Sequence, residues 1–285
     1  MTRRRRECLW RRPGPPRPRR GGAVDGSAAE VPTTAGYPPR NVGRRCSVDP
    51  EPCPQTGTRT TPEATITVPS DTVPATTVLD RQVDTLLALG YPALAGLSDA
   101  ELTTRLEPLR AVAATLPDLP AHDAPGRAPL VLVLTRDLVD PERTVPLLRL
   151  HPSGTAPGIV DRNHGEAGLE PYRPTEHAPL PDPAAYLLLD VDRGEEFRGV
   201  RPEEALPVIT GRGRTPLTIE EGIAVVTHAP ELLEKNRCFM LSGSRRGDRR
   251  VPAMWISARA PKLGWCWDGN PHDWLGVASA GSRVA

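Results

Sequence analysis

Apolar residues recur at helical spacing in two stretches near the start of the patterned part of the chain. In TTVLDRQVDTLLALGYP, from residue 76, the stripe consists of Leu79, Val83, Leu86 and Leu87. Gly90 follows as the residue that ends the helix in the left-handed conformation, and Pro92 lies beyond it. The sequence therefore predicts a helix that ends just before Gly90.

A second helix is predicted directly after the first. Ser98 and Glu101 form a capping box, because the serine and glutamate side chains can each satisfy the other's free backbone N–H group. The apolar positions that follow keep one register: Leu102, Leu106, Leu109 and Ala113. Pro108 lies inside this pattern, so we expect a kink there.

Short apolar runs without helical spacing predict buried strands. The run PLVLVL covers residues 129–134 and AAYLLLDVD covers 184–192. Pro202 favours the start of a helix, and a second capping box at Thr218 and Glu221 predicts another helix through about Thr227. We also expect a helical turn over 230–235 with an ion pair between Glu231 and Lys235.

The last part of the chain, residues 237–279, alternates strand-like runs: CFMLS, VPAMWIS, KLGWCW and WLGVAS. Helices followed by clustered strands predict an α+β fold, with N-terminal helices and a mixed or antiparallel sheet ending in a Trp-containing meander. Residues 151–183 are rich in Pro and Gly and are predicted to form a long loop, in which His151, His164 and His177 are solvated.

Residues 1–75 show neither the helical nor the strand spacing of apolar residues, and they differ in composition from the rest of the chain. They hold 13 prolines, and 13 arginines against 7 acidic residues give a net charge of +6. Because such a segment buries too little apolar surface to offset its conformational entropy, we expect a disordered tail before a single α+β domain at 76–285. The tail could instead be translated upstream DNA from a mis-called start, with Val68, Val73 or Val78 as the native start. It could also be an arm that binds nucleic acid.

The composition excludes some classes of protein. No apolar run approaches the roughly 20 residues that cross a bilayer, and no apolar segment follows the basic start, so neither a membrane protein nor a signal peptide is expected. The five cysteines show no CxxC pair, which favours free thiols in the cytoplasm. No cofactor is indicated, and the oligomeric state is left open.

Three stretches resemble signature segments of an actinobacterial family of unknown function. They are TPLTIEEGIAVVTHAPELLEKNRCF, GDRRVPAMWIS and APKLGWCWDGNPHDWLG, and the resemblance covers about residues 78–283. Arginine outnumbers lysine 34 to 2, and its codons are GC-rich, which agrees with such a source. The resemblance implies a cytoplasmic domain without an assigned activity, and it carries no functional residue to this chain.

The densest group of reactive and aromatic residues lies in LGWCWDGNPHDWLG, residues 263–276. If KLGWCW and HDWLGVAS pair as a hairpin around Asp268–Gly269, the length of the turn decides which side chains meet. A four-residue loop places Trp267 opposite His272 and Trp265 opposite Trp274, which is the register that we favour. A five-residue loop would place Cys266 opposite His272 and allow a catalytic dyad, with Asp273 or Asp190 as a third member.

Metal chemistry is less well supported by the spacing. Cys238, Cys266, His228 and His272 could supply zinc ligands, but their separation lacks the close pair of ligands typical of zinc sites. The carboxylates of Asp190 and Asp192 could bind Mg²⁺, but neighbouring Arg193 and Arg198 favour a surface ion-pair network. We therefore predict no metal site.

Two glycine-containing loops gather arginines. GRGRT, residues 211–215, precedes the Thr218 cap, and GSRRGDRR, residues 243–250, is expected at a hairpin tip. Guanidinium groups on glycine-rich loops suit phosphate or carboxylate. We expect a groove for a small anionic ligand, nucleotide-like or an acidic metabolite, between these loops and a tryptophan face. It would be lined by Arg212, Arg214, Arg245, Arg246, Arg249, Arg250, Trp265, Trp267 and Trp274.

The sequence thus leaves three functions open. The first is a binding module for a small anion, without catalysis. The second is an enzyme that uses Cys266 and His272, so enzymatic activity stays uncertain. The third, less favoured, is nucleic-acid binding through the basic tail.

Overall fold

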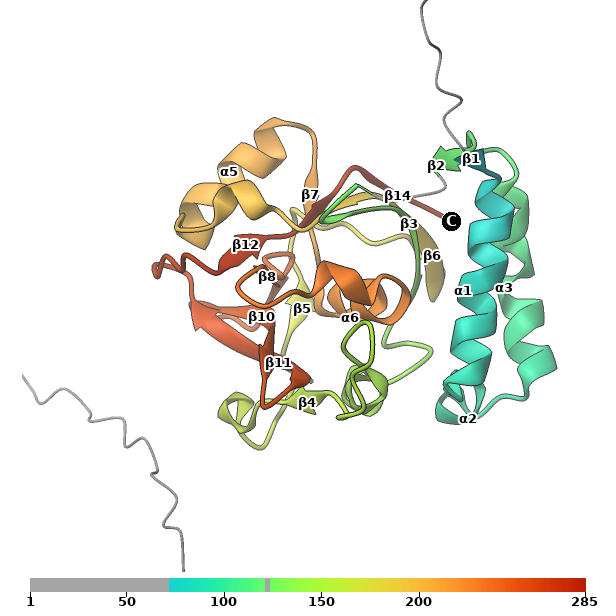
Figure 1. Cartoon of the computed structure of the whole chain (residues 1–285), viewed down its shortest axis with the longest axis horizontal. Helices are drawn as coiled ribbons and strands as arrows, with labels where there is room; N and C mark the ends of the chain where they lie inside the picture. The colour runs from blue at the N-terminus through green and yellow to red at the C-terminus, as the bar shows by residue number, and fades with distance from the viewer. Residues whose placement is uncertain (1–71, 121–123) are drawn as a thin grey trace, which may run out of the picture. The chain divides into compact units, whose positions relative to one another are not determined.

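The computed structural model describes residues 72–120 and 124–285. The fold is α+β, as predicted (Figure 1). The helices are α1 (Ala75–Ala88), α2 (Tyr91–Ala95), α3 (Asp99–Ala113), α4 (Pro141–Thr144), α5 (Pro202–Gly211) and α6 (Ile219–His228). Single 3₁₀ turns are η1 (Val145–Leu147), η2 (Arg162–His164), η3 (Glu195–Phe197) and η4 (Pro230–Leu232). No helix in these two ranges is long and apolar enough to cross a membrane.

Two five-stranded sheets form the body of the molecule. The central sheet has the order β14 (Ser282–Val284), β6 (Ala185–Asp192), β13 (Ser279–Ala280) and β7 (Thr215–Pro216), with β3 (Arg127–Leu134) on the other side of β6. The outer sheet has the order β12 (Leu275–Val277), β8 (Cys238–Met240), β10 (Arg250–Ser257), β11 (Ala260–Trp267) and β4 (Ile159–Val160). Two short ribbons pair β1 (Thr72–Val73) with β2 (Leu119–Pro120), and β5 (Arg173–Pro174) with β9 (Ser244–Arg245).

Strand β3 is buried on both faces, and its side chains alternate between two hydrophobic cores. Leu130 and Leu132 face a core shared with α1 and α3, whereas Val131 and Val133 face the core that contains α6 and the outer sheet. This alternation is what a strand with a period of two produces. The central sheet therefore lies between the helical layer formed by α1, α2 and α3 and the rest of the molecule (Figure 1).

Both predicted capping boxes are present. The side chains of Ser98 and Glu101 form one at the start of α3, and those of Thr218 and Glu221 form the other at the start of α6. Gly90 adopts the left-handed conformation, with φ of 77°, after α1. Helix α3 runs through Pro108, so the proline does not end it.

The predicted loop at 151–183 is only partly a loop. It contains β4, η2 and β5, and β4 pairs in parallel with β11 while β5 pairs with β9. Each strand has two residues, which is too short to give a periodic signal, and each finds its partner far away in the sequence. The predicted helix at 230–235 is also shorter than expected, because only the 3₁₀ turn η4 forms there.

The predicted hairpin around Asp268–Gly269 is wrong. β11 pairs antiparallel with β10 and parallel with β4, whereas β12 pairs in parallel with β8. The tight turn lies instead at Ala258 and Arg259, which both have positive φ values, 52° and 61°. Such a pair of left-handed residues makes the two-residue turn that matches the twist of its strands. Strands β8 and β10 separate β12 from β11, so neither predicted register exists.

Candidate functional site

The surroundings of Cys266 and His272 do not favour an activated pair. Burial raises the pKa of the Cys266 thiol to about 12. Burial also lowers the pKa of His272, and the charge of the neighbouring Asp273 partly offsets this lowering. His272 packs edge-on against Trp274, with ring centroids 5.5 Å apart. A thiol of high pKa stays protonated at neutral pH and is a poor nucleophile. Between residues 72 and 285, leaving out 121–123, no three His, Cys, Asp or Glu side chains gather closely enough to hold a metal ion.

The four tryptophans of the described residues separate into two groups on opposite faces of the β10–β11 pair. Trp265 and Trp267 lie two residues apart on β11, 4.8 Å between ring centroids, on the face that carries Arg250. Trp255 faces the other way, over Gly264, and packs edge-on against Trp274 at 6.3 Å. Trp274 is thus not part of the aromatic face predicted with Trp265 and Trp267; the fifth, Trp10, lies outside the described residues.

The two arginine loops do not face a common groove. Arg249 pairs with Glu203 in the first turn of α5 at 2.6 Å, while Arg212 directly follows the last turn of α5 and pairs with Glu196 at 2.6 Å. A ten-residue helix is about 15 Å long, so the loops lie near opposite ends of α5. Arg214 is bonded to Asp190 and, at 2.9 Å, to Ser279.

The predicted ion-pair network at the end of β6 exists: Arg193 and Arg198 each pair with Glu195, whereas the two aspartates pair with other arginines. Arg127 contacts Asp190 at 3.3 Å and Asp192 at 2.7 Å, and Arg214 also pairs with Asp190. Arg193 instead pairs with Glu195 at 2.9 Å. Because these carboxylates are neutralised by guanidinium groups, they do not offer a free site for a cation.

Residues 243–250 gather three of their four arginines around two buried rings. We name Arg245, Arg246 and Arg250, together with Tyr172 and His164, the arginine cluster. The guanidinium carbon of Arg246 lies 5.6 Å from the centre of the Tyr172 ring. Tyr172 packs edge-on against His164, with centroids 5.5 Å apart. The two rings are almost completely buried, with exposed fractions of 0% and 2%.

The backbone holds this loop firmly in place. Its first residues are fixed by Gly243, which donates to the Leu217 carbonyl at 2.8 Å and accepts from the Thr175 amide at 2.8 Å. A side chain at Gly243 would collide with the carbonyls of Pro216 and Leu217, so the close approach requires glycine. The ribbon of β5 and β9 then places Arg173 opposite Arg245, directly after Tyr172. Two segments some seventy residues apart thereby meet at the cluster.

Several polar atoms of the cluster lack hydrogen-bond partners of good geometry. They are both ring nitrogens of His164, the Tyr172 hydroxyl, the Arg250 Nε and the neighbouring Ser242 hydroxyl. Burial lowers the pKa of His164, and the nearby Arg246 and Arg250 add to this; the Leu263 carbonyl and Asp161 act in the opposite direction. Burial raises the pKa of Tyr172. Both rings are therefore neutral at pH 7, and buried polar groups without partners often mark a functional site.

The charges of the cluster do not cancel. Arg245 pairs with Asp268 at 3.1 Å, while Arg246 and Arg250 share the single carboxylate of Asp248, each at 3.6 Å. Three guanidinium groups against two carboxylates leave one positive charge in excess. Their side chains are only 19%, 19% and 26% exposed. A partly buried excess of positive charge favours the binding of an anion.

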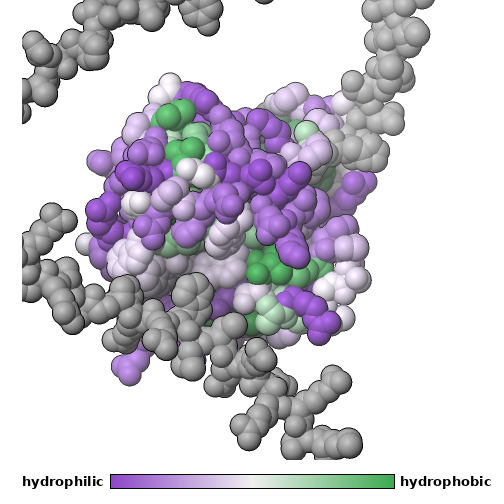
Figure 2. All heavy atoms as spheres, turned by 60° about the vertical axis from the view of Figure 1, so that its left-hand side comes forward, coloured by the Kyte–Doolittle hydropathy of each residue, from purple (hydrophilic) through white to green (hydrophobic). Residues whose placement is uncertain are grey.

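The cluster is bordered by the tryptophans of β11. The Arg250 guanidinium lies over Trp265, 4.5 Å from the ring centre, and 6.0 Å from that of Trp267. The indole N–H of Trp265 donates to the Asn163 carbonyl at 3.0 Å, which ties β11 to the turn that carries His164. Figure 2 shows the side of the molecule that bears the outer sheet and α5; hydrophilic residues dominate its visible surface.

Sequence reasoning found part of this site. It identified Arg245, Arg246, Arg250 and Trp265 from the loop and the aromatic run, and it missed Tyr172 and His164. The prediction that His164 is solvated is wrong, because η2 turns its ring into the core. One local signal existed: Asp161 caps the turn DRNH by accepting from the Asn163 amide at 2.8 Å, which is the pattern of an ordered turn.

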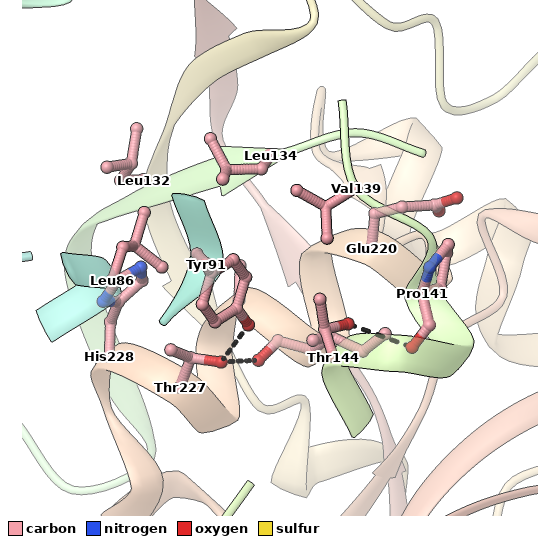
Figure 3. A pocket seen from close by; sticks show the side chains of 12 residues that line it. Leu86, Tyr91, Leu132, Leu134, Val139, Pro141, Thr144, Glu220, Thr227 and His228 are labelled. Atoms are coloured by element: carbon pink, nitrogen blue, oxygen red, sulfur yellow. Dashed lines mark hydrogen bonds between the residues drawn. The ribbon is translucent and has the colours of Figure 1, made fainter. Parts of the chain in front are cut away.

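A small hollow lies between the helical layer and α6, away from the arginine cluster (Figure 3). Its volume is about 20 Å³, which is room for about one water molecule. Most of its lining is apolar, with Glu220 and His228 at its edge and a contact of 3.4 Å between the hydroxyls of Tyr91 and Thr227. It is too small to bind an organic ligand.

Comparison with curated proteins and with solved structures gives no match. A protein-family model, in contrast, matches residues 85–285, a range that contains the whole arginine cluster and both sheets. It agrees with the resemblance over 78–283 that the sequence motifs indicated. The predicted basic arm lies in residues 1–71, outside the described residues and outside this match. The chain belongs to DUF5701, a family of unknown function.

Proposed function

We propose that this protein binds a small anionic ligand at the arginine cluster. One observation carries the proposal: three guanidinium groups converge on two buried neutral rings, His164 and Tyr172, whose polar atoms lack hydrogen-bond partners of good geometry. An anion placed there would accept charge-assisted hydrogen bonds and offset the excess positive charge. In this proposal the protein acts as a binding module. The alternative of a cysteine enzyme gains no support, because desolvation raises the pKa of the partly buried Cys266 thiol to about 12.

The experiment compares thermal stability with and without inorganic phosphate and sulfate. A ligand at ten times its dissociation constant stabilises the folded state by about 1.4 kcal/mol, and this raises Tm by about 3–6 °C for a domain of this size. We expect this rise for the natural chain. We expect it to vanish when Arg246 and Arg250 are both changed to alanine.

The matched control is Arg105→Ala on α3, an exposed arginine far from the cluster in the sequence. It should keep the full rise in Tm. Far-UV circular dichroism shows whether the double variant folds, and Arg246→Lys provides a milder change that keeps the charge but loses the planar fork. A folded double variant with an undiminished rise, or a natural chain that neither anion stabilises, would refute the proposal.

A further inference from the structure

The arginine cluster borders an exposed aromatic ring. Trp267 is 46% exposed, the largest exposed fraction among the large hydrophobic residues of the described part of the chain. Its neighbour Trp265 is more fully engaged, because Arg250 lies 4.5 Å from the centre of its ring, against 6.0 Å for Trp267, and its N–H group is bonded to Asn163. Trp267 is therefore the ring of this pair that is available to stack with a ligand.

The donors of the cluster fit a phosphate group better than a carboxylate. A carboxylate offers two oxygen atoms in one plane, whereas a phosphate monoester offers three acceptor oxygens pointing in different directions. The Tyr172 hydroxyl and the ring of His164 are buried without hydrogen-bond partners of good geometry, and the guanidinium groups of Arg246 and Arg250 lie beside them. His164, Tyr172 and Arg250 come from three separate segments, η2, the residue before β5 and the start of β10, so they reach the cluster from different parts of the chain.

The distance between the Arg250 guanidinium and the Trp267 ring indicates which group the ligand has in addition to its phosphate. The Arg250 guanidinium lies 6.0 Å from the Trp267 ring, and an anion bonded to it would be offset from that ring rather than on top of it. A sugar between the anion and a flat base spans such an offset. Stacking of a base on an indole works for every nucleobase, because each has a π-face.

We propose that the anionic ligand is a nucleoside monophosphate, with its phosphate at Arg246 and Arg250 and its base stacked on Trp267. This inference rests on the proposed function, since it presupposes an anion at the arginine cluster. It goes beyond that function by naming the class of ligand and by assigning base recognition to Trp267.

The experiment measures the dissociation constants of AMP, ribose 5-phosphate and inorganic phosphate by isothermal titration calorimetry. We expect AMP to bind about ten-fold more tightly than ribose 5-phosphate, the usual scale of a base–indole stack. Trp267→Ala should abolish this difference while leaving the affinity for ribose 5-phosphate unchanged. Trp267→Phe should retain most of it, because a smaller ring still stacks.

Val208→Ala on α5 serves as the control, since Val208 is another exposed large hydrophobic residue, 42% exposed. It should leave all three dissociation constants unchanged. Two results would overturn this inference and leave the proposed function standing. One is equal binding of AMP and ribose 5-phosphate to the natural chain. The other is a preference for AMP that survives in Trp267→Ala. A chain that binds none of the three compounds would lose both proposals.

Discussion

Cys266 shows how its surroundings set the chemistry of a single residue. Burial alone raises its pKa to about 12, and burial also raises that of Cys238. Because the thiolate is the reactive species, a protonated thiol in an apolar setting reacts slowly. The raised pKa thus gives no support to nucleophilic catalysis by Cys266, and the aromatic rings of residues 263–276 pack against one another and against Trp255.

We therefore predict that Cys266 and Cys238 react with iodoacetamide at pH 7.5 several-fold more slowly than free glutathione. Peptide mapping by mass spectrometry after timed quenching measures the rate for each cysteine. The same reaction in denaturant is the control. There the labelling rates of Cys266 and Cys238 should both rise to the labelling rate of free glutathione. Labelling of Cys266 faster than glutathione in the folded protein would restore the cysteine-enzyme hypothesis.

His228 is a second residue whose ionisation depends on burial. It lies at the end of α6, where burial lowers its pKa from 6.5 to about 4 and its Nδ1 has no hydrogen-bond partner. Below pH 6.5 the His228 imidazole takes up a proton more readily in the unfolded chain than in the folded chain. The contribution of the neutral imidazole to stability is therefore complete above pH 6.5 and is lost as the pH falls toward 4.

We predict that the free energy of unfolding of the natural chain decreases by about 3 kcal/mol more than that of His228→Gln between pH 7 and pH 4, since each unit of pKa corresponds to about 1.4 kcal/mol. Urea titrations at a series of pH values measure both curves. Carboxylates also titrate in this window, so the difference between the two proteins isolates His228. The exposed His177→Gln is the control and should follow the natural chain; if His228→Gln follows it as well, the imidazole is not the titrating group.

At the scale of elements, Gln82 joins α1 to the free edge of β3. Its amide nitrogen donates to the Leu130 carbonyl at 2.8 Å, and its amide oxygen accepts from the Leu132 N–H at 2.6 Å. β3 pairs with β6 on its other side only, so the glutamine occupies the place of a neighbouring strand. This covers an edge that would otherwise expose unpaired backbone groups.

We predict that Gln82→Ala lowers the free energy of unfolding by about 2–4 kcal/mol, because it leaves a buried N–H and a buried carbonyl without partners. Gln82→Glu should be nearly as harmful, since a carboxylate cannot donate to Leu130. Asp84→Ala, an exposed change on the same helix, is the control and should stay within about 0.5 kcal/mol of the natural chain. Urea denaturation followed by circular dichroism measures all three, and a Gln82→Ala value equal to that of Asp84→Ala would contradict this role.

The elements that could be predicted from the sequence are those defined by local interactions. Both capping boxes and the helix end at Gly90 depend on residues within one turn, and all of them form. The strand partners could not be predicted, because β12 joins β8 and β4 joins β11 through contacts between distant segments. The same limit explains the site: the arginines of one loop were visible in the sequence, but Tyr172 and His164 reach them only through the pairing of β5 with β9 and of β4 with β11.

At the scale of the whole molecule, the C-terminal strand is tied to α6 by a buried ion pair. Arg283 on β14 is 5% exposed and contacts the Glu221 carboxylate, which is 0% exposed, through two bonds of 2.5 and 2.9 Å. The Tyr186 hydroxyl of β6 donates to the same carboxylate at 2.8 Å. Glu221 also completes the capping box of α6 by accepting from the Thr218 amide at 2.8 Å. One carboxylate thus connects the central sheet, the helix start and the chain end.

Removing one partner of such a pair leaves an uncompensated buried charge. We predict that Arg283→Met lowers the free energy of unfolding by about 3–5 kcal/mol. Adding Glu221→Gln to it should restore part of that loss, because glutamine is neutral and still completes a capping box. The double-mutant cycle, measured by urea denaturation, gives the coupling between the two residues, and we expect at least about 1 kcal/mol. Strictly additive losses would mean that Arg283 stabilises the chain end through its own packing and its bonds to Thr215 and Pro216, so that the carboxylate would have no part in holding β14 against the sheet.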